Sequence, residues 1–132
     1  MATTTATITL SSADLTGDAL SLSSTATLTK AGTLTGLDQT TGVGRKTTTS
    51  SSQYTLVDKA DYADDKAHKV YIKNTSTSNS EFITIELGGS NVSLGRLYGG
   101  DWMLIPYDGN NDIDIDTSDV NMTVEYLVIY EA

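Results

Sequence analysis

The beginning of the chain alternates between apolar and hydroxyl-bearing side chains, and this period of two constrains the fold more than any other feature. Between residues 5 and 10 threonines hold the odd positions, and Ala6, Ile8 and Leu10 hold the even ones. A β-strand sends successive side chains to opposite faces, so the pattern predicts a strand with one apolar and one hydroxyl face. The pattern returns over residues 20–28, where only Ser24 interrupts it.

Composition supports strands throughout the chain. The 22 threonines are β-branched and favour strands, and 14 serines accompany them. Hydrophobic residues make up 38% and charged residues 19%, which excludes both a membrane protein and highly charged disorder. There is one proline and no cysteine, so disulfide frameworks, thiolate metal sites and cysteine nucleophiles are excluded.

We expect residues 1–50 to form a Thr/Ser-rich N-terminal arm and linker. Residues 38–52 hold almost no apolar side chain and are interpreted as a loop. The residues before them contain no aromatic side chain and too few bulky groups to repay their own ordering entropy. Such an arm gains stability by pairing with another sheet, and a sheet of a neighbouring subunit is one candidate. The predicted partner contacts on the arm are Ile8, Leu10, Leu20 and Leu22.

Residues 51–132 are expected to form an antiparallel β-sandwich or jelly-roll-like domain, which makes the whole chain all-β. All nine aromatic residues lie here, and pairs such as Gly88-Gly89 and Gly99-Gly100 separate short alternating segments. The last segment is apolar on both faces and is expected to be a central, covered strand. The predicted strands span residues 53–57, 69–74, 81–87, 92–98, 102–106, 112–116 and 122–130.

Few residue patterns point to chemistry. In residues 112–116 isoleucines alternate with aspartates, which favours inward isoleucines and solvated carboxylates over a metal site. The spacing does not match an EF-hand loop. His68 is the single histidine, lies between lysines in the local sequence and is interpreted as a surface residue; no Gly-X-Ser-X-Gly elbow accompanies it. We therefore expect no catalytic residue, no metal and no cofactor.

Three aromatic residues near residue 100 suggest a contact surface. Trp102 opens the apolar run 102–105 and is expected in the core, whereas Tyr98 and Tyr107 lie beside glycines near strand ends and are predicted to be exposed partner contacts. An alternative is a glycan-binding β-sandwich module that uses these three rings, with calcium at residues 108–116.

The net charge of −9 is unevenly distributed. Residues 101–132 carry eight acidic residues and no base. Such a chain repels phosphates, so no nucleic-acid partner is expected. The longest apolar runs, residues 102–106 and 126–130, are too short to span a bilayer, and no basic start followed by a continuous apolar run is present, so no membrane partner is expected.

The second half of the chain resembles a known group of proteins. The segments KVYIKNTS (69–76), EFITI (81–85) and GRLYGGDW (95–102), followed by Ile105-Pro106 and Glu125-Tyr126, are similar to β-rich virion structural proteins of marine tailed phages, notably those that infect cyanobacteria. The similarity covers roughly residues 37–132. It implies a location in the virion after synthesis in the host cytoplasm, and it implies no catalytic residue.

From the residues and the resemblance we expect a non-enzymatic capsid decoration or cement protein. Its partners would be the major capsid protein or other virion proteins, and it would be a homo-oligomer. A neck, tail or fibre component is the alternative within the same class. The glycan-binding module is the alternative from another class.

Overall fold

The computed structural model describes residues 2–15, 17–89 and 92–132, which fall into two compact units. The first unit is residues 1–38 and the second is residues 39–132. The division therefore lies between Asp38 and Gln39, and the boundary expected near residue 50 is wrong. The regular secondary structure described in both units is β-strand apart from one short 3₁₀ helix, as predicted for an all-β protein.

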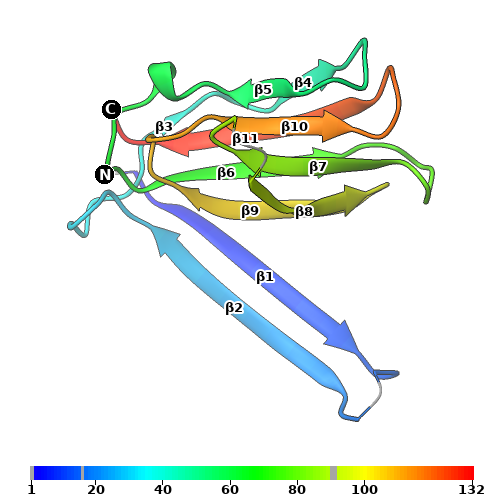
Figure 1. The fold of residues 1–132 in the computed structure, drawn as a ribbon. Coiled ribbons are helices and arrows are strands. Elements are labelled where there is room, and N and C mark those ends of the chain that lie inside the picture. Colours follow the sequence, from blue (N-terminus) through cyan, green and yellow to red (C-terminus); the bar gives the residue numbers. More distant parts are fainter. Residues whose placement is uncertain (1, 16, 90–91) are drawn as a thin grey trace. The chain divides into compact units, whose positions relative to one another are not determined.

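The first unit is a β-hairpin built from β1 (Thr4–Ser12) and β2 (Leu20–Leu28) (Figure 1). The two strands pair antiparallel over their full length, with Leu10 opposite Leu22 and Thr7 opposite Thr25. Among the described residues each pairs only with the other, so both strands carry a free edge there. An isolated bridge between Thr29 and Gly36 closes the segment that follows the hairpin.

The second unit is an antiparallel β-sandwich (Figure 1). Sheet I has the strand order β5-β10-β7-β8, and sheet II has the order β3-β11-β6-β9, with β4 also paired to β11. Sheet I contains β5 (Tyr54–Val57), β10 (Ile113–Thr117), β7 (Phe82–Leu87) and β8 (Val92–Tyr98). Sheet II contains β3 (Gln39–Thr40), β4 (Gly44–Thr47), β11 (Thr123–Tyr130), β6 (His68–Asn74) and β9 (Trp102–Tyr107).

The core lies between the two sheets, and alternation along each strand fills it. Sheet I contributes isoleucines that face inward from two paired strands, and sheet II contributes residues of β6 and β11 with the same parity. Burying one such side chain completely stabilises the fold by about 1.5–3 kcal/mol. The fully or almost fully buried aliphatic residues of these strands are Ile83, Ile85, Ile113, Ile115, Val70, Ile72, Val124 and Val128.

Each of the seven strands predicted between residues 53 and 130 has an observed counterpart, but the interpretation of residues 38–52 as a loop is wrong. This segment contains β3 and β4, which pair with opposite ends of β11. Just after β4, Thr48 is fully buried; its backbone N–H donates to Met122 O, and its Oγ1 lies 3.3 Å from Thr117 Oγ1. Sheet pairing at the edge of a sandwich requires backbone groups more than apolar side chains, so composition did not reveal these strands. Residues 58–67, between β5 and β6, contain the short 3₁₀ helix η1 (Lys59–Asp61).

Candidate interaction surfaces

The hairpin has one apolar and one hydroxyl face, as the alternation predicts. The register places Leu10 beside Leu22 and Ala6 beside Ala26 on the same face. Of the predicted arm contacts, Ile8, Leu10, Leu20 and Leu22 have exposed fractions between 37% and 47%. These side chains therefore form an exposed apolar row on a two-stranded ribbon.

The opposite face of the hairpin carries only threonine and serine. Thr7 and Thr25 face each other there, with 2.8 Å between their Oγ1 atoms. Neither strand contains a charged residue or a proline. Sheet proteins commonly protect free edges with lysine, proline or short strands. This ribbon uses none of these protections, so its backbone edges are open to a further strand.

The two predicted tyrosine contacts differ in exposure. Tyr98 is 42% exposed, and its ring packs beside Phe82 with 5.4 Å between the ring centres. Tyr107 is only 6% exposed, so its prediction as an exposed contact is wrong. In β9 the residues Met103, Ile105 and Tyr107 share the inward parity and pack against the core. A surface built from Tyr98, Trp102 and Tyr107 together is therefore not formed.

Trp102 was expected in the core and instead is 53% exposed. It begins β9 with the outward parity, because only alternate residues of a strand can face the core. Its ring lies 6.3 Å from the ring of Tyr71, and Leu104 pairs with Tyr71 in the ladder. The last strand, β11, is central as predicted, but Leu127, which pairs with Tyr71 on the same face, is half-buried rather than covered. The outer face of sheet II is thus partly apolar.

His68 is fully buried, which corrects its interpretation as a surface residue. Its Nδ1 accepts a hydrogen bond from the backbone N–H of Glu131 at 3.3 Å, so its proton is on Nε2, which donates to Ala63 O at 2.9 Å. The rings of Tyr62, Tyr107 and Tyr130 surround it with centre distances of 5.6, 5.8 and 6.4 Å. Both ring nitrogens are hydrogen-bonded to backbone groups, so neither is free to act as a general base.

Burial also affects the tyrosine next to His68. Burial, followed by the charge of Asp112, raises the pKa of Tyr107 to about 12, and its hydroxyl group has no hydrogen-bond partner among residues 2–15, 17–89 and 92–132. Burial raises the pKa of Tyr62 as well. By contrast, hydrogen bonds from Asn110 lower the pKa of Asp108.

The acidic segment 108–116 follows the prediction only in part. Ile113 and Ile115 face inward as expected, but Asp114 is only 3% exposed and Asp116 is half-buried, so the carboxylates are not simply solvated. Asp112 Oδ1 accepts from the backbone N–H of Lys59 at 2.9 Å, which fixes a loop. Within the described residues no group of three or more His, Cys, Asp or Glu side chains is arranged to hold a metal ion.

Comparison with known proteins identifies no relative. No family model, no curated protein and no solved structure matches the chain. Separately, the described residues contain no helix with the length and apolar character that a bilayer crossing requires.

Proposed function

We propose that this chain is a non-enzymatic structural protein of a phage particle, a capsid decoration or cement protein that attaches through its N-terminal hairpin. The observation that carries the proposal is the uncharged ribbon of β1 and β2, with an exposed apolar row on one face and free backbone edges. The resemblance of residues 37–132 to virion proteins of marine tailed phages supports the choice of particle.

The energetics of a two-stranded ribbon favour a partner. An isolated hairpin is marginally stable in water, and a third strand or a packed layer is needed to stabilise it. Leu10 and Leu22 form a cross-strand pair that remains more than 40% exposed. Covering such a face adds apolar burial, and pairing at a free edge adds backbone hydrogen bonds.

The charge distribution supports the hairpin as the attachment site. The chain has a net charge of −9, with eight acidic residues and no base in residues 101–132. Copies that approach through the acidic part of the sandwich repel one another. The hairpin strands carry no charge, so contact through them desolvates no ionised group.

Two matched variants test the attachment. Leu10→Ser with Leu22→Ser removes the exposed cross-strand leucine pair, whereas Thr7→Ser with Thr25→Ser changes the hydroxyl face three pairs away along the same ladder. Each tagged protein is mixed with virus particles purified from the source and sedimented. We expect the leucine variant to bind at least tenfold more weakly and the threonine variant to bind like the parent chain. Equal binding by both variants would contradict attachment through the apolar face.

Localisation on the particle separates the alternatives. Antibodies against the sandwich should label the shell of purified particles in electron micrographs. Label confined to the neck, tail or fibres would support the alternative structural role, and particles that lack the protein would overturn the proposal. A glycan array probed with and without chelator should show no sugar-dependent binding, because a sugar-dependent signal would favour the glycan-binding module.

A further inference from the structure

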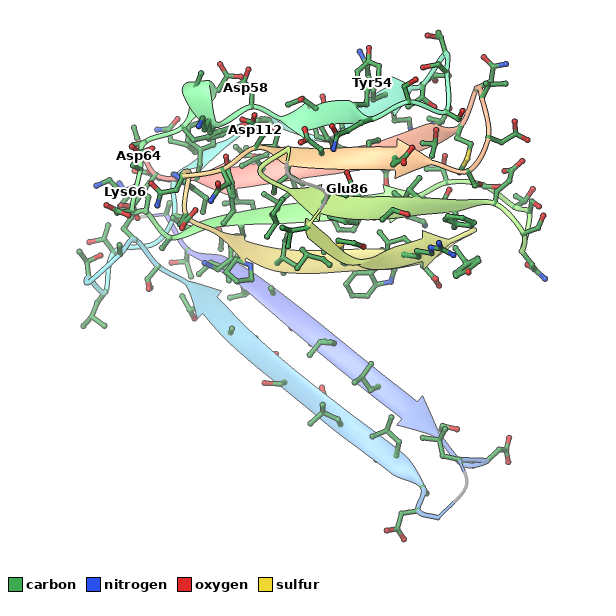
Figure 2. The ribbon with its side chains drawn as sticks, in the orientation of Figure 1. Tyr54, Asp58, Asp64, Lys66, Glu86 and Asp112 are labelled. Carbon is green, nitrogen blue, oxygen red and sulfur yellow. The ribbon has the colours of Figure 1, made fainter. Side chains whose placement is uncertain are left out.

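Two carboxylates lie side by side within sheet I, buried away from solvent. Asp114 on β10 pairs directly with Glu86 on β7, and directly opposed residues share one face of a sheet. Asp114 is 3% exposed and Glu86 is 8% exposed. Figure 2 shows Glu86 in the central part of the sandwich, and its Oε2 accepts a hydrogen bond from Gln53 Nε2.

Within the part of the chain that the structure describes, the Oδ1 atom of Asp114 has no hydrogen-bond partner, although it is shielded from solvent. Its other cross-strand neighbour is Thr55 on β5, and Glu86 in turn pairs with Ser93 on β8. Thr55, Asp114, Glu86 and Ser93 thus form one cross-strand row of sheet I. The row therefore supplies oxygen atoms and no base. Among the described residues no ion pair includes Glu86 or Asp114.

The nearby base on this face is engaged elsewhere. Arg96 pairs with Thr84, two residues before Glu86, and its guanidinium carbon lies 4.2 Å from the ring centre of Phe82. Like charges directly opposite each other in a ladder destabilise it unless a positive charge compensates them. Among the described residues, therefore, no positive charge compensates the two carboxylates.

The pairing of the strands is irregular on both sides of this row. The pairing register shifts between Ile113 and Asp114 on the β5 side, and between Ile85 and Glu86 on the β8 side. Such shifts redirect side chains and are frequent beside functional sites. Gly89 lies against the row as well, because a Cβ atom there would be 3.8 Å from Asp114 Oδ2.

We propose that Asp114 and Glu86 bind a hard divalent cation such as Ca²⁺. Carboxylates are the oxygen ligands that Ca²⁺ and Mg²⁺ prefer, and the hydroxyl of the neighbouring Thr55 and water could complete the coordination. The ion would supply the missing positive charge and join β10 to β7. It stabilises sheet I independently of the hairpin, so this inference does not rest on the proposed function.

The test compares two aspartates on the same strand. Asp114→Asn removes one proposed ligand, and Asp116→Asn removes the same formal charge from the same face one row away, opposite Thr84. Thermal unfolding of the full-length chain is measured in EDTA, in CaCl₂ and in MgCl₂, and Ca²⁺ affinity is measured by calorimetry. We expect Ca²⁺ to raise the unfolding temperature of the parent and of Asp116→Asn, and Asp114→Asn to bind at least tenfold more weakly.

A second variant guards against an effect specific to one residue. Glu86→Gln should also lose the Ca²⁺ response, while its circular dichroism spectrum in EDTA remains that of the folded parent. Two results would overturn the proposal: no response of the parent to either cation, or an equal response in Asp114→Asn and Asp116→Asn.

Discussion

At the scale of single residues, Asn74 connects the two sheets of the sandwich. It is fully buried at the end of β6 in sheet II, and its Nδ2 donates to Leu97 O of β8 in sheet I at 3.0 Å. Its Oδ1 accepts from the backbone N–H of Ser76 at 3.0 Å. One side chain thus binds a backbone carbonyl of sheet I and a backbone N–H just after β6, and a buried carbonyl that loses its donor carries a desolvation penalty.

Asn74→Asp should therefore destabilise the sandwich more than the small change in side-chain size suggests. The carboxylate keeps the shape of the amide but presents oxygen to Leu97 O, where a donor is required. We expect a loss of about 3 kcal/mol in the free energy of unfolding, and a loss of about 2 kcal/mol for Asn74→Ala. Urea denaturation measures both. Asn79→Asp, at an exposed turn position, is the control and should change stability by less than about 0.5 kcal/mol.

Tyr107 should make stability depend on alkaline pH. Its pKa is raised from 10.0 to about 12 in the folded chain, because burial disfavours the ionised ring. The folded state therefore retains a proton that the unfolded state releases, so this contribution is intact below pH 10 and is lost between about pH 10 and pH 12. Tyr107→Phe should reduce this alkaline decline at little cost near neutral pH, since the hydroxyl group has no partner.

Thermal unfolding measured from pH 8 upwards tests this expectation. The exposed Tyr98→Phe serves as the control and should follow the parent curve. An alkaline decline that is identical in Tyr107→Phe and in the parent would contradict the role given to Tyr107. Burial also raises the pKa of Tyr62, so a shallower decline remains in the variant.

At the scale of elements, period-two patterns predicted the strands of the sandwich and both faces of the hairpin. They could not predict β3 and β4, whose partner lies far along the chain: Arg45 on β4 reaches Glu125 on β11, a separation of 80 residues. Pairing of this kind depends on backbone hydrogen bonds, and the Thr-rich segment has no hydrophobic pattern from which it could be predicted.

The errors at the candidate surfaces have a similar cause. Every residue of the run 102–105 is apolar, so alternation alone does not reveal that Met103 faces the core and Trp102 faces outward. His68 is buried by the rings of Tyr62 and Tyr130, and the latter comes from the far end of the chain. The burial of Asp114 depends likewise on its pairing with Glu86. Local sequence predicts the elements, whereas the site depends on which elements meet.

At the scale of the whole molecule, the two units have different physical roles. The sandwich holds the large hydrophobic core, while the hairpin leaves its apolar row exposed. We therefore expect the hairpin to mediate association and the sandwich to fold without it. Deleting residues 2–38 should leave a sandwich that unfolds cooperatively, because the core cluster lies entirely within residues 39–132.

The native mass of the protein tests this separation. Light scattering of the full-length chain should give a multiple of 14.0 kDa, and the deleted chain should be a monomer. Association through uncharged strands should persist in about 1 M salt, where the Debye length falls to about 3 Å and ion pairs between exposed groups are screened. An oligomer that dissociates in salt would instead indicate contacts between charged surfaces. A full-length chain that remains at 14.0 kDa at high concentration would contradict self-association, and a deleted chain that still oligomerises would place the interface on the sandwich.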